Sequence, residues 1–159
     1  TYDLLFSAPI SVVAIVGGKF LAAVLVYTAL LLLTVVLPMM LGQWAAFPWS
    51  ALLSAYLGFW LLGLVFIGVG LFASALTEYQ IVAAFTGVGI LLVLWVLGLV
   101  AQDTEHTTLS TVLRKLSVSV HFDDFVQGLV NSTSIIFFLS FMLFWLTAAY
   151  RVVEANRWR

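Results

Sequence analysis

The 159-residue chain contains no cysteine and carries very little charge. The absence of cysteine excludes disulfide bonds, thiolate metal sites and a cysteine nucleophile. Charged residues make up 8% of the chain, whereas a soluble domain typically has about 25%. Hydrophobic residues make up 64%, which is more than a small soluble domain can bury. Lipid imposes no such restriction, and a net charge of −1 gives no sign of nucleic-acid binding.

Several sequence motifs are also missing. Gly17-Gly18-Lys19 ends like a nucleotide-binding loop, but Val13 stands where such a loop needs its first glycine, and Phe20 follows the lysine. The HExxH and GxSxG motifs do not occur. The only polar residues in the predicted spans are Thr, Ser, Tyr and Trp, whereas proton- or ion-coupled carriers keep ionisable residues there. These absences argue against ATP binding by this chain, an intramembrane protease and a proton-coupled carrier.

Long apolar runs predict an all-α, polytopic membrane protein. No Asp, Glu, Lys or Arg occurs from Phe20 to Thr77, and a bilayer-crossing helix needs about 20 apolar residues. Gly42, Gln43 and Pro48 divide this stretch, and neighbouring tryptophans suit the headgroup zone. We therefore predict a single transmembrane domain over 1–159, with four spans at about 20–41, 51–74, 81–101 and 134–150.

Local signals add detail to these spans. Pro38 falls in the last turns of the first span, where a kink is tolerable. Thr77 and Gln80 match a capping box, which would start the third span and place Glu78 in its first turn. Small residues at four-residue spacing would let helices approach closely, and whether they mark a subunit interface stays open; the pairs are Ser54/Gly58, Gly70/Ser74 and Ala83/Gly87.

The positions of Lys and Arg predict that both ends of the chain face the cytosol. In this orientation Lys19 and the arginines of the 151–159 tail lie inside, while Arg114 and Lys115 lie outside. Residues 102–133 then form the one large external segment.

The external segment predicts two short amphipathic helices separated by a break over 117–119. Apolar residues recur there at helical spacing, first at Leu109, Val112, Leu113 and Leu116, then at Phe122, Phe125, Val126, Leu129 and Val130. Both helices are too short to cross a bilayer, so we expect them to lie at the outer interface or to dip in and return.

Asp123 and Asp124 fall in the first turn of the second predicted external helix. We interpret them as solvated acids stabilised by the helix N-terminus. A paired acid/base site or a cation site is the alternative. His106 and His121 are likewise interpreted as solvated, with metal binding as the alternative.

Residues 1–19 are predicted to form a cytoplasmic segment with a helix leading into the first span. Pro9 disfavours helix before it, and Ser11 suits the N-cap position. This segment is either an interfacial helix or a coupling element that docks a soluble partner. The candidate coupling residues are Asp3, Leu4, Leu5, Phe6, Pro9 and Ser11.

Five segments in order carry a family resemblance: LLFSAPIS, GGKFLAA, LTEYQIVAAF, HFDDFVQGLVNSTSIIFFLS and RVVEANRWR. The chain resembles the permease subunits of type-2 ABC transporters, most closely the gliding-motility-type bacterial permeases. Each segment is a weak signal alone, and the ordered set, which covers essentially the whole chain, is more specific. Relatives often carry charge just after the Pro-x-Ser turn, where this chain has Val12, Val13 and Ala14.

The resemblance implies a transport role without catalysis by this chain. It implies a six-span subunit, of which the first two spans are missing here, in a bacterial inner membrane. Two permease subunits would pair, and each would meet a separate cytoplasmic ATPase that binds the ATP, so no cofactor is expected on this chain. Residues 3–11 would match the ATPase-contacting loop, and 109–131 the external re-entrant helices.

Two other functions are consistent with the sequence. The chain could be a helical anchor or assembly subunit of a larger membrane complex, without a translocation path. A membrane enzyme using Asp123, Asp124 and His121 at the outer face is the third hypothesis.

Overall fold

The computed structural model describes residues 10–103 and 108–158, and the described part of the chain is all-helical. Four stretches in it are long and apolar enough to cross a membrane, which confirms the expected number of long apolar helices and indicates a membrane-embedded protein. The helices are α2 (Val12–Thr34), α3 (Val36–Leu41), α4 (Trp49–Leu76), α5 (Gln80–Asp103), α6 (Thr108–Leu116), α7 (Val118–Val126) and α8 (Ser132–Arg157).

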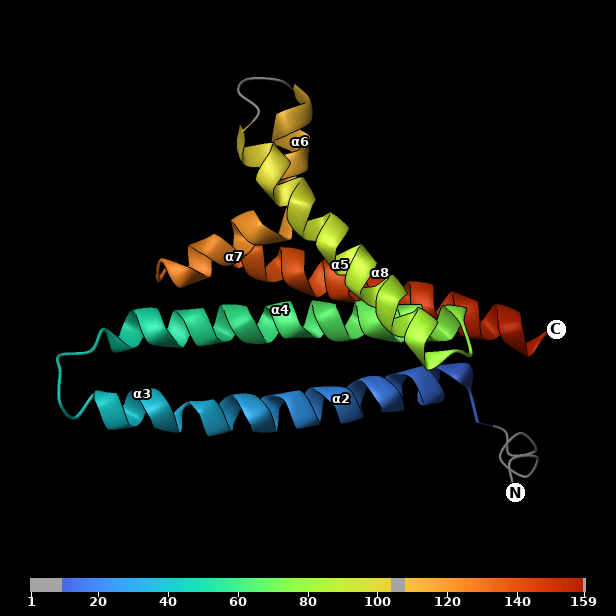
Figure 1. The fold of residues 1–159 in the computed structure, drawn as a ribbon, viewed down its shortest axis with the longest axis horizontal. Helices are drawn as coiled ribbons and strands as arrows, with labels where there is room; N and C mark the ends of the chain where they lie inside the picture. The colour runs from blue at the N-terminus through green and yellow to red at the C-terminus, as the bar shows by residue number, and fades with distance from the viewer. Residues whose placement is uncertain (1–9, 104–107, 159) are drawn as a thin grey trace.

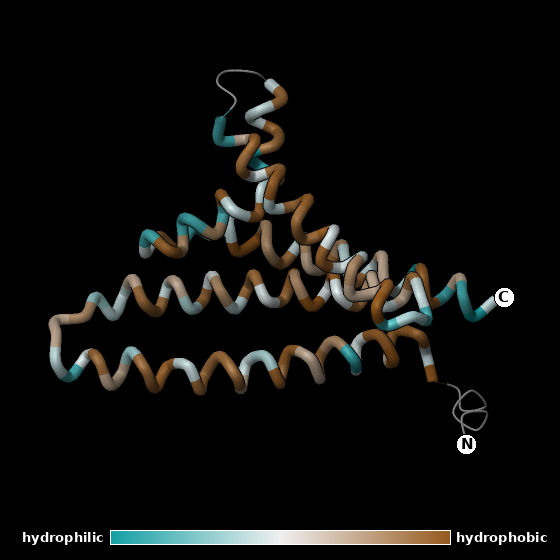
Figure 2. Tube along the Cα trace, in the orientation of Figure 1, coloured by the Kyte–Doolittle hydropathy of each residue, from teal (hydrophilic) through white to brown (hydrophobic). Residues whose placement is uncertain are grey.

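Helix α4 is the centre of the arrangement, because α2, α5, α7 and α8 all contact it. Figure 1 shows α2 running antiparallel to α4, with α8 beside α4 and α5 crossing them obliquely. The start of α2, the α4–α5 turn and the end of α8 lie at one end of the molecule, and the α3–α4 loop lies at the other. Figure 2 shows hydrophilic residues mainly near these ends and along α6 and α7.

The first long helix starts earlier than the predicted span. The Ser11 hydroxyl accepts a hydrogen bond from the Ala14 N–H at 3.2 Å, which confirms Ser11 as the N-cap. From Val12 the helix continues through Phe20 without interruption. One helix therefore covers both the predicted entry helix and the start of the first span, as expected for a helix that leads into the span.

This helix is interrupted one turn before Pro38. Helix α2 ends at Thr34, and α3 begins at Val36 after a single turn residue. Proline has no N–H to donate to the carbonyl four residues earlier, which here is Thr34, so the regular hydrogen-bond ladder is broken at this point. The last turns of the first span, where a kink is tolerable, thus contain a helix interruption.

The predicted capping box at the α4–α5 turn does not form. The Thr77 hydroxyl accepts from the Tyr79 N–H at 3.2 Å, two residues along the chain, rather than from the third. Helix α5 begins only at Gln80, so Glu78 precedes the helix instead of lying in its first turn. The hydroxyl–backbone turn around Thr77 satisfies the local donor and delays the helix start.

Helix α8 is longer than the predicted fourth span at both ends. It runs from Ser132 to Arg157, so most of the 151–159 tail is helical. The Tyr150 hydroxyl donates to the Glu154 carboxylate at 3.3 Å, and the Asn156 amide donates to the Ala75 carbonyl of α4 at 3.2 Å. The apolar run ends near Tyr150, but the helix continues beyond it, and these polar contacts hold the continuation in place.

The core lies between α4, α7 and α8. Val65 and Val69 of α4 are fully buried, as are Phe125 of α7 and Phe138 of α8. By contrast, most large apolar side chains of α2 and α5 are exposed. A helix that is apolar all round yet exposed is suited to contact with lipid, so the two outer helices fit the membrane environment that the composition indicates.

Candidate functional site: the inserted helix α7 and the α2–α4 groove

Small residues form the junction where α5 leads into the two short helices. Gly98 of α5 lies directly against the hydroxyls of Ser117 and Ser119, and these hydroxyls are 2.9 Å apart. Ser117 is also the N-cap of α7, since its hydroxyl accepts from the Val120 N–H at 3.4 Å. The predicted break over 117–119 is thus shorter than expected, because only Ser117 separates α6 from α7 and Ser119 already belongs to α7.

Helix α7 packs back into the bundle rather than lying on its surface. Phe125 has 0% exposure and lies against Gly58 of α4, where a side chain would overlap its ring. The Ser54 hydroxyl donates to the Phe125 carbonyl at 3.0 Å, and the Phe125 and Phe138 ring centroids are 6.0 Å apart. The apolar residues of α6 differ, because Leu109, Val112 and Leu116 remain exposed.

The three small-residue pairs have different environments. Ser54 and Gly58 receive α7 of the same chain, as described above. Gly87 of α5 lies against Ala73 of α4, so it also serves an internal contact. Gly70 and Ser74 are exposed and leave one small-residue face of α4 open.

The predicted position of the two adjacent acids is wrong. Asp123 and Asp124 lie in the second half of α7, because Ser117 caps the helix and starts it at Val118. Asp123 is exposed. Asp124 points instead to the start of α8, where it accepts from the Asn131 amide at 3.3 Å and from the Ser134 hydroxyl at 3.1 Å. The two carboxylates do not converge, and Asp124 joins α7 to α8.

His121 is partly buried in the middle of α7 and is not at its start, so the prediction of a solvated histidine there is wrong. Its Nδ1 lies 2.8 Å from the Ser117 carbonyl, and its ring stacks on Phe137 with centroids 4.0 Å apart. His106 lies outside the described residues. Among the residues that the structure describes, no group of three or more His, Cys, Asp or Glu side chains could hold a metal ion.

A glycine ends α7 and sets the path into α8. Gly128 has φ +83°, the left-handed conformation that glycine adopts without strain. Its N–H donates to the Phe125 carbonyl at 3.1 Å, and the Leu129 N–H donates to the Asp124 carbonyl at 2.9 Å. This pair of bonds is the Schellman motif, a common helix C-terminus. It turns the chain so that Asn131, at the N-cap position of α8, lies next to Asp124 and donates to it instead of capping the helix.

Three side-chain hydrogen bonds join α2 to α4. The Tyr27 hydroxyl donates to the Phe59 carbonyl at 2.6 Å, and the Tyr27 ring lies against Gly63. The other two follow one pattern, in which an aromatic side chain of α4 meets a threonine hydroxyl of α2. They join Trp60 to Thr28 at 3.0 Å and Tyr56 to Thr34 at 3.2 Å.

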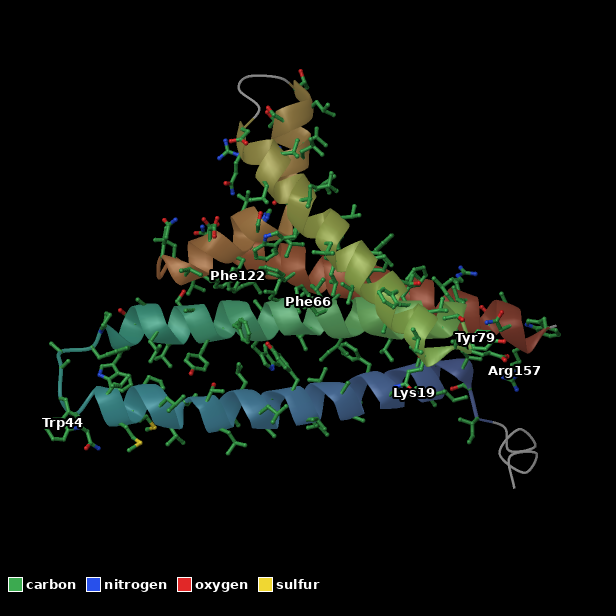
Figure 3. The ribbon with its side chains drawn as sticks, in the orientation of Figure 1. Lys19, Trp44, Phe66, Tyr79, Phe122 and Arg157 are labelled. Carbon is green, nitrogen blue, oxygen red and sulfur yellow. The ribbon has the colours of Figure 1, made fainter. Side chains whose placement is uncertain are left out.

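A groove with two cavities runs between α2 and α4, on either side of Tyr56. One cavity, of about 300 Å³, is lined by Leu31, Thr34, Leu52, Ala55, Tyr56, Phe59 and Phe122. The other, of about 340 Å³, extends toward Trp49 and Trp60. Phe122 comes from α7, and Figure 3 shows it on the α4 side of that helix. The inserted helix therefore forms part of the wall of the first cavity.

The residues of the groove carry no sequence motif that marks them as a site. Tyr56 and Trp60 are spaced by one helical turn, and Thr28 and Thr34 are neutral polar residues within an apolar span. That signal was present, but it could not show that these residues face one another. Of the predicted coupling residues, Ser11 is the N-cap of α2, whereas Asp3, Leu4, Leu5, Phe6 and Pro9 lie outside the described residues.

No protein-family model, curated protein or solved structure matches this chain. The fold class therefore stands on the helices themselves, as an all-helical arrangement with four helices able to span a membrane.

Proposed function

We propose that the chain is the membrane-spanning permease subunit of an ATP-driven transporter of the type-2 ABC class. In this proposal a separate cytoplasmic ATPase supplies the energy, a second permease subunit completes the translocation path, and both ends of this chain face the cytosol of a bacterial cell. The chain itself moves between conformations and performs no chemistry.

The insertion of α7 carries the proposal. The resemblance implies external re-entrant helices between the last two spans, and α6 and α7 lie between the last two long helices in sequence. Phe125, buried against Gly58, brings α7 back into the bundle. This insertion lies away from the end where Lys19, Tyr79 and Arg157 gather in Figure 3. The end with Lys19, Tyr79 and Arg157 therefore remains available for an ATPase.

Copurification tests the proposal directly. The complete subunit is extracted from its own membrane in mild detergent, and we expect an ATPase chain to copurify with it. Replacing the apolar patch Leu4–Phe6 by serines should remove that ATPase. The matched control replaces Leu109, Val112 and Leu116, three exposed apolar residues of α6, and should retain it. Extraction of the unaltered subunit without any ATPase would refute the proposal.

The helical anchor or assembly subunit remains the second candidate, and the exposed apolar faces of α2 and α5 are the observation that favours it. Those faces could contact other subunits as readily as lipid. The two functions differ in their effect on solute movement. In vesicles containing the whole complex, an anchor predicts that ATP-dependent transport does not change when the groove between α2 and α4 is filled by larger side chains.

A further inference from the structure

The α2–α4 groove contains a hydroxyl oxygen, that of Tyr56, which accepts no hydrogen bond from the described residues. The Thr34 hydroxyl lies 2.6 Å from the Leu31 carbonyl. A carbonyl can only accept, so the single hydroxyl hydrogen of Thr34 is used in that bond. In the contact between Thr34 and Tyr56, the Tyr56 hydroxyl must therefore be the donor.

This assignment leaves the Tyr56 oxygen with its hydrogen committed and its lone pairs free. Within residues 10–103 and 108–158 no other hydrogen bond to this oxygen is observed. Both Tyr56 and Thr34 line the cavity of about 300 Å³, and the other lining residues are apolar. The polar character of the cavity is thus that of an acceptor only.

The spacing from Trp49 places the acceptor within the expected hydrocarbon region, where water is scarce. Tyr56 follows Trp49 by roughly 10 Å along α4, and tryptophan prefers the membrane–water interface. A polar group in the hydrocarbon region is costly unless it finds a partner. Ordinary lipid tails have no donor to offer, so they fill the cavity without satisfying the oxygen.

We propose that this cavity binds an alkyl chain that carries a hydroxyl group, with the ligand hydroxyl donating to the Tyr56 oxygen. The apolar lining, including Phe122 of α7, takes the hydrocarbon, and Tyr56 recognises the donor. That such a molecule is transported cargo rests on the proposed function, whereas its binding does not.

Photolabelling with a matched pair of probes tests the site. The purified full chain is placed in phosphatidylcholine vesicles, because that lipid has no hydrogen-bond donor. A long-chain alcohol carrying a photoreactive diazirine is then activated, and labelled peptides are identified by mass spectrometry. We expect labels on the segments around Leu31, Ala55 and Phe122. Unlabelled alcohol should compete about fivefold better than its methyl ether, the effect of one net hydrogen bond.

Two variants and a control locate the preference. The double variant Tyr56→Phe/Thr34→Val removes both hydroxyl oxygens that line the cavity, so alcohol and ether should compete equally; Tyr56→Phe alone would free the Thr34 oxygen to accept. Thr34→Val frees the Tyr56 hydrogen to donate to the ligand, so the ether should improve and the preference should again disappear. Tyr27→Phe removes an α2–α4 hydrogen bond that involves no lining residue except Phe59, and should leave the preference unchanged.

Each remaining result bears on the proposal. Equal competition by alcohol and ether in the unaltered chain would show a general lipid-facing groove and overturn the proposal. A preference that persists in the Tyr56→Phe/Thr34→Val double variant would overturn it as well. Since no ATPase is present, preferential labelling together with failed copurification would refute the proposed function and leave the site standing. Copurification of an ATPase without preferential labelling would support the proposed function and overturn the proposed binding site.

Discussion

The contact between Tyr27 and Gly63 provides the sharpest test of the α2–α4 packing. The Tyr27 ring lies where a side chain at residue 63 would have to stand. Gly63→Ala should therefore force the ring away and weaken its hydrogen bond to the Phe59 carbonyl. Overpacking of this kind costs about 1–3 kcal/mol. Against it stands the helix propensity of alanine, which favours the variant by about 1 kcal/mol.

A double-mutant cycle separates these two terms. In a Tyr27→Ala background the ring is gone, so Gly63→Ala should keep only the propensity gain and become neutral or stabilising. The difference between the two backgrounds then equals the overlap alone, about 1–3 kcal/mol. The assay is equilibrium unfolding in mixed micelles with increasing sodium dodecyl sulfate, followed by far-ultraviolet circular dichroism.

Gly70→Ala is the matched control, because it lies on the same helix with nothing near the position of the added methyl. It should behave identically in both backgrounds. If Gly63→Ala also changed stability by the same amount with and without the Tyr27 ring, the reasoning about this contact would be wrong.

Three further predictions concern α7. Asp124→Ala should destabilise the α7–α8 connection by about 1–3 kcal/mol through loss of the charged acceptor for Ser134, while exposed Asp123→Ala should stay within about 0.5 kcal/mol in the same unfolding assay. Gly128→Ala should cost about 1–2 kcal/mol because of its positive φ, and hydrogen exchange should show faster opening of the end of α7. Ser54→Ala should remove the bond to the α7 backbone, and a spin label on α7 should report increased motion; an unchanged spectrum would contradict that role.

The long apolar helices and some of their caps were predictable from the sequence. Hydropathy is a local property, so the four long helices follow from runs of apolar residues. Ser11 was identified as an N-cap because the preference for serine there depends on backbone donors within one turn. Pro38 was likewise identified, since the missing N–H acts on its own helix.

The boundaries of α7 and α8 were less predictable. Helical spacing from Phe122 onward correctly indicated a helix and its apolar face, but spacing does not fix where a helix begins. Ser117 fixes that start, which moves Asp123 and Asp124 into the second half of the helix. At the other end, α8 continues past Tyr150 because Glu154 and Asn156 find polar partners.

The groove could not have been predicted from one sequence. Tyr56 and Thr34 are 22 residues apart and meet only because α2 and α4 are antiparallel at a particular register. The same holds for Tyr27 and Gly63, whose contact depends on which faces of two uniformly apolar helices turn toward each other. Uniform hydropathy leaves that rotation undetermined.

The threonine–aromatic bonds between α2 and α4 have a consequence for how the protein responds to its surroundings. These bonds and the Tyr27–Phe59 bond join hydroxyl, indole and carbonyl groups, and none is an ion pair. Added salt therefore leaves them intact. The pairing of α2 with α4 should accordingly be as stable at high ionic strength as at low ionic strength.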